Sequence, residues 1–249
     1  MSAIVEVRNF SAWYGPHPAL REITLDVADH EILGIIGPAS SGKTTFLRSL
    51  NRLNDLLPDF RVAGSIQFRG LEINRRDVDL AALRRKLGMV FAVPVPLPGT
   101  IHENLMLGPR LNNTNPDAGS LVEKTLRAAY LWDEVKDRLE QSAFALSGGQ
   151  QQRLCLARTL MMEPDVLLLD EPCSGLDPIS TARIEEALVE LKKELTVILV
   201  TNNVMQASRV ADRTAFFLQG RLIECGVTQQ IFVNPREKET HEYVSGRFG

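Results

Sequence analysis

The sequence has no long uninterrupted apolar run. No stretch of its 249 residues approaches the roughly 18 consecutive apolar residues that a membrane-spanning helix requires. The first ten residues, MSAIVEVRNF, also lack the basic start and apolar core of a secretory signal. We therefore expect any association with a membrane to run through a partner protein.

Cysteine is scarce, and charge of one sign is not in excess. The cysteines at 155, 173 and 225 are odd in number and lack metal-ligand spacing, which favours free thiols in a reducing cytoplasm. The formal net charge of −3 gives no basic surplus, so the composition argues against a nucleic-acid partner. Because neither a Gly/Ser-rich linker nor an internal repeat divides the chain, we expect one domain over residues 1–249.

Short apolar runs and helical patterns alternate along the chain. Three runs are typical of buried strands: residues 31–36, 165–170 and 196–201. Residues 179–194 have a helical pattern, and the order predicts a mainly parallel α/β sheet with helices on both faces. Segments typical of antiparallel strands lie at 3–8, 20–27 and 215–226, the last with a turn at Gln219-Gly220. Residues from about 93 to 160 begin with prolines and continue as helix-like sequence, which predicts a helical subdomain inserted in the core.

Residues 37–44 read GPASSGKT and fit the phosphate-loop pattern G-x-x-x-x-G-K-[ST]. Glycines let the backbone N–H groups point inward at phosphate, and the following helix adds its positive dipole end. Lys43 is expected to reach the β- and γ-phosphates of ATP, and the Thr44 hydroxyl to coordinate Mg²⁺. The expected nucleotide contacts from this loop are Gly37, Pro38, Ala39, Ser40, Ser41, Gly42, Lys43, Thr44 and Thr45.

The segment VLLLDEP at 166–172 is an apolar strand that ends in two acids. Such a strand delivers its carboxylates to the carboxyl edge of the sheet, where open α/β sheets bind ligands. We expect Asp170 to hold the Mg²⁺ shell and Glu171 to act as the general base for the attacking water.

The segment LSGGQQQR at 146–153 resembles the signature sequence of ABC ATPases, and it precedes the acid pair at the spacing of that family. The resemblance implies a P-loop NTPase fold with an antiparallel β subdomain and a helical subdomain. It also implies that Ser147, Gly148, Gly149 and Gln150 contact ATP held by a second copy, so the chain would work as a head-to-tail homodimer. SGLDP at 174–178 resembles the loop that follows this interface.

An aromatic residue of the family stacks on adenine just before the second strand. Tyr14, within WYGPHPAL, occupies the matching position, and Trp13 is the competing candidate.

Further segments resemble the ATPase subunit of bacterial phosphate importers, including LNRLNDLLP (50–58), ENLMLGPR (103–110) and RVADRTAFFLQGRLIE (209–224). By this resemblance two copies lie under two transmembrane permease subunits, peripheral to the cytoplasmic face of the inner membrane. An extracytoplasmic phosphate-binding protein delivers the cargo, and residues 93–145 form the groove that faces the membrane. An importer of another solute, and a soluble ABC ATPase acting on DNA or ribosomes, are the alternatives; the latter usually has insertions or a second ATPase half that this chain lacks.

Two positions depart from the family pattern. Ala92 stands where the family has a glutamine near Mg²⁺, and Asn202 stands where it has a histidine that contacts the γ-phosphate. Loss of one well-placed transition-state donor typically lowers kcat by about 10²–10³. One hypothesis is therefore normal MgATP binding with slow hydrolysis, as in a regulatory subunit. The other is that Asn202 and a neighbouring group compensate.

Overall fold

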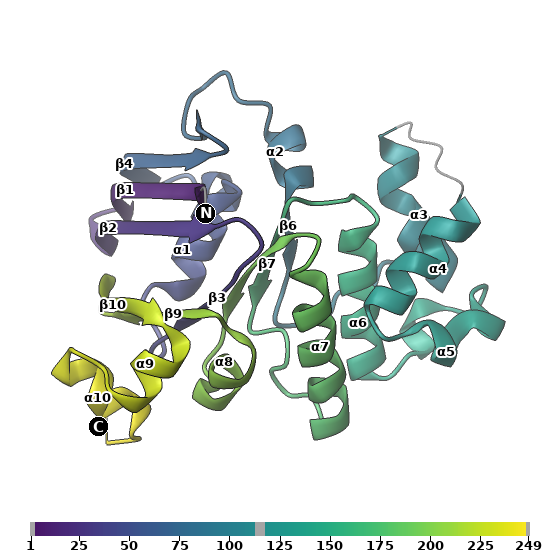
Figure 1. Cartoon of the computed structure of the whole chain (residues 1–249). Helices are drawn as coiled ribbons and strands as arrows, with labels where there is room; N and C mark the ends of the chain where they lie inside the picture. Colours follow the sequence, from purple (N-terminus) through teal and green to yellow (C-terminus); the bar gives the residue numbers. More distant parts are fainter. Residues whose placement is uncertain (1–2, 113–117, 248–249) are drawn as a thin grey trace.

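The computed structural model describes residues 3–112 and 118–247, which form two β-sheets and a group of helices. Figure 1 shows an antiparallel sheet on one side, the central sheet in the middle and helices α3–α6 on the other side. Residues 1–2, 113–117 and 248–249 lie outside the described part of the chain. The expected domain (1–249) and the expected helical insertion (about 93–160) are therefore described except for these residues.

The antiparallel sheet has the strand order β2-β1-β4-β5. Its strands are β1 (Ala3–Tyr14), β2 (His17–Ala28), β4 (Phe60–Phe68) and β5 (Leu71–Glu72). The β1–β2 hairpin is longer than the two predicted segments because pairing continues to Tyr14 and His17, where Gly15 turns the chain with φ +55°. One face of the hairpin buries apolar side chains such as Phe10 and Ile23 against the central sheet.

The central sheet has the order β10-β9-β3-β8-β7-β6. Its strands are β3 (Ile32–Ile36), β6 (Leu87–Val90), β7 (Val166–Asp170), β8 (Thr196–Val200), β9 (Arg213–Leu218) and β10 (Arg221–Val227). The pairs from β6 to β9 are parallel, and β9 and β10 are antiparallel. Every residue of β3, β7 and β8 is buried, as both faces of a parallel sheet are covered. The predicted fold class is confirmed.

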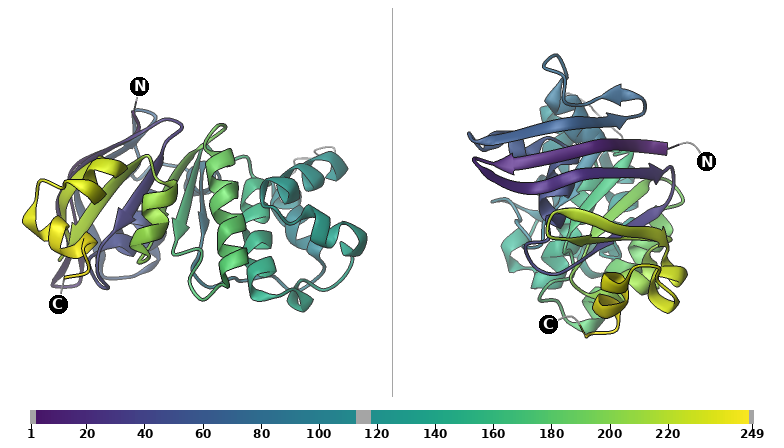
Figure 2. Two further views of the ribbon diagram at one scale, coloured as in Figure 1. Left: turned by 60° about the horizontal axis from the view of Figure 1, so that its bottom comes forward. Right: turned by 90° about the vertical axis from the view of Figure 1, so that its left-hand side faces the viewer.

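Helices cover both faces of this sheet (Figure 2). Those attached to the core are α1 (Lys43–Leu50), α2 (Leu80–Lys86), α7 (Pro178–Leu191), α8 (Val204–Val210), α9 (Thr228–Val233) and α10 (Lys238–Val244). Between β6 and β7 lie α3 (Ile101–Leu111), α4 (Ala118–Ala128), α5 (Trp132–Val135) and α6 (Gly148–Leu160). Short 3-10 turns occupy Leu53–Leu56, Lys136–Arg138 and Ala143–Ala145.

The sequence patterns missed the elements between residues 60 and 86. None of the first six residues of β4 is buried: four are exposed, and Phe60 and Ser65 are half-buried. The burial pattern therefore has no clean alternation before Ile66. The loop from residue 91 to residue 99 is also not helical, because prolines at 94, 96 and 98 remove backbone donors. Helix α3 begins only at Ile101, after a capping box formed by Thr100 and Glu103.

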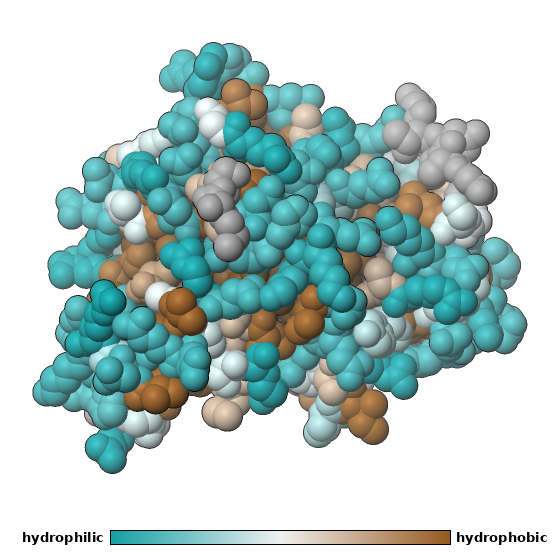
Figure 3. Space-filling model, viewed as in Figure 1, coloured by the Kyte–Doolittle hydropathy of each residue, from teal (hydrophilic) through white to brown (hydrophobic). Residues whose placement is uncertain are grey.

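The surface is mostly polar on the face drawn in Figure 3, where hydrophobic residues form small separate areas. Within the described ranges, no helix has both the length and the apolar character needed to cross a membrane.

Glu134 on α5 ties three helices together. Its carboxylate accepts hydrogen bonds from Gln150 (2.7 Å) and Arg153 (2.6 Å) on α6 and from Arg183 (2.5 Å) on α7. Burial alone would raise the pKa of Glu134, but the hydrogen bonds from Arg153 and Gln150 outweigh it and lower that pKa. Because the Arg153 side chain is only 4% exposed, Glu134 serves as the counter-ion of a buried charge.

Replacing Glu134 with Gln should lower the free energy of unfolding by about 1–3 kcal/mol, because Arg153 would keep its charge without a counter-ion. Urea unfolding monitored by circular dichroism measures the change. Glu123→Gln is the matched control, since it removes an exposed (i, i+4) pair with Arg127 on α4 and should change stability by less than about 0.5 kcal/mol. Equal effects of the two substitutions would contradict the role of Glu134.

Candidate nucleotide site

The phosphate loop follows β3 and can be built only with glycine at its two ends. Gly37 has φ +149°, and a Cβ atom there would lie 2.1 Å from the carbonyl oxygen of Phe217. Gly42 has φ +99°, and its Cβ would lie 2.8 Å from the side chain of Leu20. Between them Ala39 and Ser40 are exposed and Ser41 is buried. Helix α1 starts directly after the loop, so its amino-terminal N–H groups face the loop's concave side.

Lys43 lies inside the curl of the loop. Its ammonium donates hydrogen bonds to the carbonyl oxygens of Gly37 (2.7 Å) and Pro38 (2.8 Å), and the residue is 5% exposed. Burial lowers the pKa of Lys43, and the carboxylates of Glu171 and Asp170 oppose that shift. The Lys43 ammonium therefore interacts both with the carbonyl oxygens of the loop and with the carboxylates of Asp170 and Glu171.

Thr44 and Asp170 meet across the site. The Thr44 hydroxyl donates to Asp170 Oδ1 at 2.8 Å, and Arg48 lies 3.6 Å from Asp170 Oδ2. Asp170 is 5% exposed. In the part of the chain that the structure describes, no three His, Cys, Asp or Glu side chains converge as a metal cluster. One hydroxyl and one carboxylate nevertheless fit Mg²⁺, which takes few protein oxygens and completes its shell with water and phosphate.

Glu171 is held from two directions. Its backbone is in the left-handed region (φ 49°), and its N–H donates to the carbonyl oxygen of Val200 at 2.8 Å. Its Oε1 accepts a hydrogen bond from the amide of Asn202, which follows β8 on the exposed side of the site. The side chain of Asn202 is thus directed at the expected general base.

Ala92 follows β6 and is half-buried in the loop that leads to α3. The backbone of this loop is bonded to the signature helix, because Gln152 Nε2 donates to the Phe91 carbonyl at 2.8 Å. Gln152 is 1% exposed and was missed as a functional candidate from the sequence. Its place inside LSGGQQQR was the available signal.

The signature segment caps helix α6. Ser147 and Gln150 form a capping box, with the Gln150 N–H 3.4 Å from the Ser147 hydroxyl. A Cβ at Gly149 would lie 2.2 Å from Ser180 Oγ on α7, whereas no atom lies within 4 Å of the same position at Gly148. Gly149 therefore serves packing inside the chain, and Gly148 leaves open space at the helix start.

The structure does not bring the signature segment to the phosphate loop of its own chain. Helix α6 and the loop before α1 lie on opposite sides of α7 and β7 (Figures 1 and 2). The loop from residue 174 to residue 178 lies near the signature instead. Its Asp177 accepts from Ser180 Oγ at 2.6 Å, and a Cβ at Gly149 would lie 2.2 Å from that Oγ and 3.9 Å from Asp177 Oδ2.

Tyr14 and Trp13 project from β1 in different directions, as neighbours on a strand do. The Tyr14 hydroxyl lies 3.2 Å from Thr45 Oγ1, and its ring packs on Phe60 with centroids 5.2 Å apart. Trp13 instead lies under the guanidinium of Arg61, 5.5 Å from the ring centroid. Of the two aromatic candidates, Tyr14 is the one beside the phosphate-loop helix.

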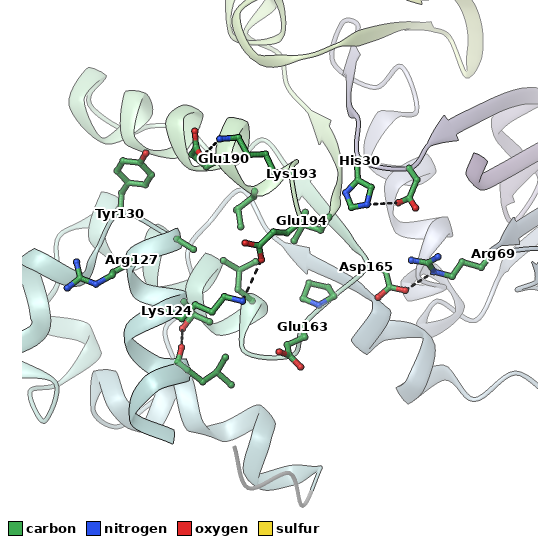
Figure 4. Close-up of a pocket in the computed structure, with 18 residues that line it drawn as sticks. His30, Arg69, Lys124, Arg127, Tyr130, Glu163, Asp165, Glu190, Lys193 and Glu194 are labelled. Carbon is green, nitrogen blue, oxygen red and sulfur yellow. Dashed lines mark hydrogen bonds and ion pairs between the residues drawn. The ribbon is translucent and has the colours of Figure 1, made fainter. Parts of the chain in front are cut away.

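A separate hollow of about 610 Å³ lies at the opposite, amino-terminal edge of the sheet, between α4 and the end of α7. Figure 4 shows that charged side chains around it pair with one another, among them Lys124 with Glu194 (3.5 Å) and Arg69 with Asp165 (2.8 Å). It contains none of the expected nucleotide contacts.

Comparisons with known proteins identify the family. A family model described as ABC transporter matches residues 20–174. The chain is 53% identical over 248 residues to phosphate import ATP-binding protein PstB 2 of Shouchella clausii (strain KSM-K16), covering 99% of this chain and 92% of that protein. It is 51% identical over 254 residues to phosphate import ATP-binding protein PstB 1 of Synechococcus sp. (strain JA-3-3Ab), covering 98% and 92%.

Among solved structures, cbiO1 from Clostridium perfringens, described as part of the ABC transporter complex cbiONQ, is similar with a TM-score of 0.82. It is 27% identical, and the match covers 94% of this chain and 92% of that chain. The family model matches more than half of the chain, and the PstB relatives match nearly all of it. The chain therefore belongs to the ABC transporter family, among its ATP-binding proteins.

Proposed function

We propose that this chain hydrolyses ATP as one half of a head-to-tail homodimer and thereby drives uptake of inorganic phosphate through two transmembrane permease subunits. The observation that carries the ATPase activity is the convergence of Lys43, the Thr44–Asp170 pair and Glu171 at one edge of the sheet. Phosphate as the cargo rests on relatives at 51–53% identity over almost the whole chain, both named as phosphate import ATP-binding proteins.

The loop from Gly37 to Thr45 binds the phosphates through backbone N–H groups and the Lys43 ammonium. Thr44 and Asp170 would hold Mg²⁺, which would supply positive charge to balance the phosphates. Glu171 accepts the proton of the attacking water. Tyr14 supplies a ring for adenine, and Ser147, Gly148, Gly149 and Gln150 meet the triphosphate held by the second copy.

Asn202 restrains the general base. Its amide donates to Glu171 Oε1, which orients the carboxylate. A donor engaged with Glu171 is not directed at the γ-phosphate. Together with Ala92, whose methyl group cannot coordinate or donate, this arrangement favours slow hydrolysis with MgATP binding retained.

The permease subunits would dock on the loop after β6 and on α3. Their exposed apolar side chains are Phe91 (40%), Val93 (72%), Val95 (54%), Leu107 (39%) and Leu111 (74%). Exposed apolar residues in such number on one loop and one helix are typical of a protein–protein contact. The chain would then lie peripherally at the cytoplasmic face of the inner membrane, and an extracytoplasmic phosphate-binding protein would supply the cargo.

Replacing Glu171 with Gln should lower kcat by about 10²–10⁴ because the amide cannot take a proton. With MgATP the variant should remain a dimer, which light scattering after size-exclusion chromatography would detect. Lys43→Ala is the control that loses phosphate binding and should stay monomeric under the same conditions. A Glu171→Gln variant that keeps normal turnover would show that another group serves as the base.

The double substitution Ala92→Gln, Asn202→His should raise kcat about tenfold or more, because it restores a polar side chain near Mg²⁺ and a donor for the γ-phosphate. Steady-state phosphate release from MgATP, with membrane partners present, measures the gain. Adding Glu171→Gln to the double variant should remove it. Equal, high rates in the unaltered chain and the double variant would instead show that Asn202 is a sufficient replacement.

Replacing Val93 with Asp should reduce radiolabelled phosphate uptake by cells about tenfold or more, because the carboxylate would be desolvated against the permease. ATP hydrolysis by the isolated chain should be unchanged. Leu71→Asp is the matched control, since Val93 and Leu71 are each 72% exposed and Leu71 lies on the antiparallel sheet. Normal uptake by the Val93 variant would argue against docking at this loop.

A further inference from the structure

The last helix, α10, is fixed beside the nucleotide site. The backbone N–H groups of Arg236 and Glu237, just before it, donate to the carboxylate of Glu224 on β10 at 2.9 and 3.2 Å. Thr240 within the helix is fully buried. In Figure 1 α9 and α10 lie below β9 and β10. Helix α10 is therefore packed against the rest of the chain and tied to β10 through Glu224.

Tyr243 on α10 packs against the sheet where β3 ends. Its ring stacks on Phe216 with centroids 4.9 Å apart and planes 21° apart. Phe216 on β9 is paired with Ile36 on β3, the residue directly before Gly37. Ile36, Phe216 and Tyr243 belong to one apolar cluster. The stack thus places the phenol of Tyr243 at the entrance of the phosphate loop.

The phenol oxygen meets the loop itself. Burial raises the pKa of Tyr243, a hydrogen bond from the backbone N–H of Gly37 lowers it, and the Glu171 carboxylate raises it further. The carbonyl oxygen of the same Gly37 accepts from Lys43 at 2.7 Å. Gly37 is therefore held through its N–H by α10 and through its carbonyl by the phosphate-binding lysine.

We propose that Tyr243 is a positioning residue for nucleotide binding, which anchors the first residue of the phosphate loop from the carboxy-terminal helix. This inference rests on the proposed function of the site as an ATP site. The hydroxyl acts through Gly37 and does not itself touch nucleotide. The ring, by contrast, contributes to the packing of α10, so the two roles of Tyr243 can be separated by substitution.

The test compares Tyr243→Phe, which keeps the stack and removes the hydroxyl, with the unaltered chain. Its Kd for MgADP, measured by calorimetric titration, and its KM for MgATP should each rise about threefold to tenfold, the usual effect of one lost hydrogen bond. The value of kcat should change less than about twofold, because no transition-state donor is removed. The thermal midpoint should fall by no more than about 2–4 °C, the size expected for one lost hydrogen bond.

Tyr130→Phe is the matched control, because that phenol is 37% exposed and lies on the other side of the molecule, after α4. It should leave Kd, KM and the thermal midpoint unaltered. Tyr243→Leu, which also removes the stack, should lower the midpoint and weaken MgADP binding at least as much as Tyr243→Phe.

Two failures are distinguishable. If Tyr243→Phe binds MgADP with the affinity of the unaltered chain while Tyr243→Leu only loses stability, Tyr243 has a packing role alone and the inference is wrong. If the unaltered chain itself binds neither MgADP nor MgATP, the proposed function fails instead.

Discussion

The hydrogen bond between Thr44 and Asp170 joins two segments that are distant in the sequence and on which every other feature of the site depends. It links the start of α1 to the end of β7, across the intervening strand β8. The bond can form only because β3, β8 and β7 are parallel and all deliver their carboxyl ends to one edge. The same register brings Asn202, after β8, next to Glu171, after β7. A shift of one strand by a residue would separate these groups and move the apolar side chains of that strand to the opposite faces of the sheet.

Much of this arrangement could be predicted from the sequence, because motifs encode local backbone needs. The glycines of GPASSGKT anticipate two positions where a side chain would collide with Phe217 or Leu20. The apolar runs at 31–36, 165–170 and 196–201 correspond to the three fully buried strands. Strand β4 escaped prediction because its first residues are exposed on both faces and carry no periodic signal.

Contacts between distant segments could not be predicted from the sequence, for a different reason. The links from Gln152 to Phe91, from Glu134 to Arg183 and from Tyr243 to Phe216 depend on how helices settle on the sheet. No spacing rule within one segment predicts them. The resemblance placed Asn202 where the family has a histidine that contacts the γ-phosphate. It could not indicate that the Asn202 amide is directed at Glu171. The roles assigned to the individual site residues stay predictions.

The contrast between Gly148 and Gly149 has a consequence for the activity of a pair in which one chain is inactive. Gly149 is closed off by Ser180, whereas the space at Gly148 is open and lies away from the phosphate loop of its own chain. In the proposed head-to-tail pair, each chain would contribute halves of two different sites. In a cell that makes both normal and inactive chains, a pair with both sites intact requires two normal chains. The fraction of fully competent pairs then falls as the square of the normal fraction, so an inactive copy harms its partner as well as itself.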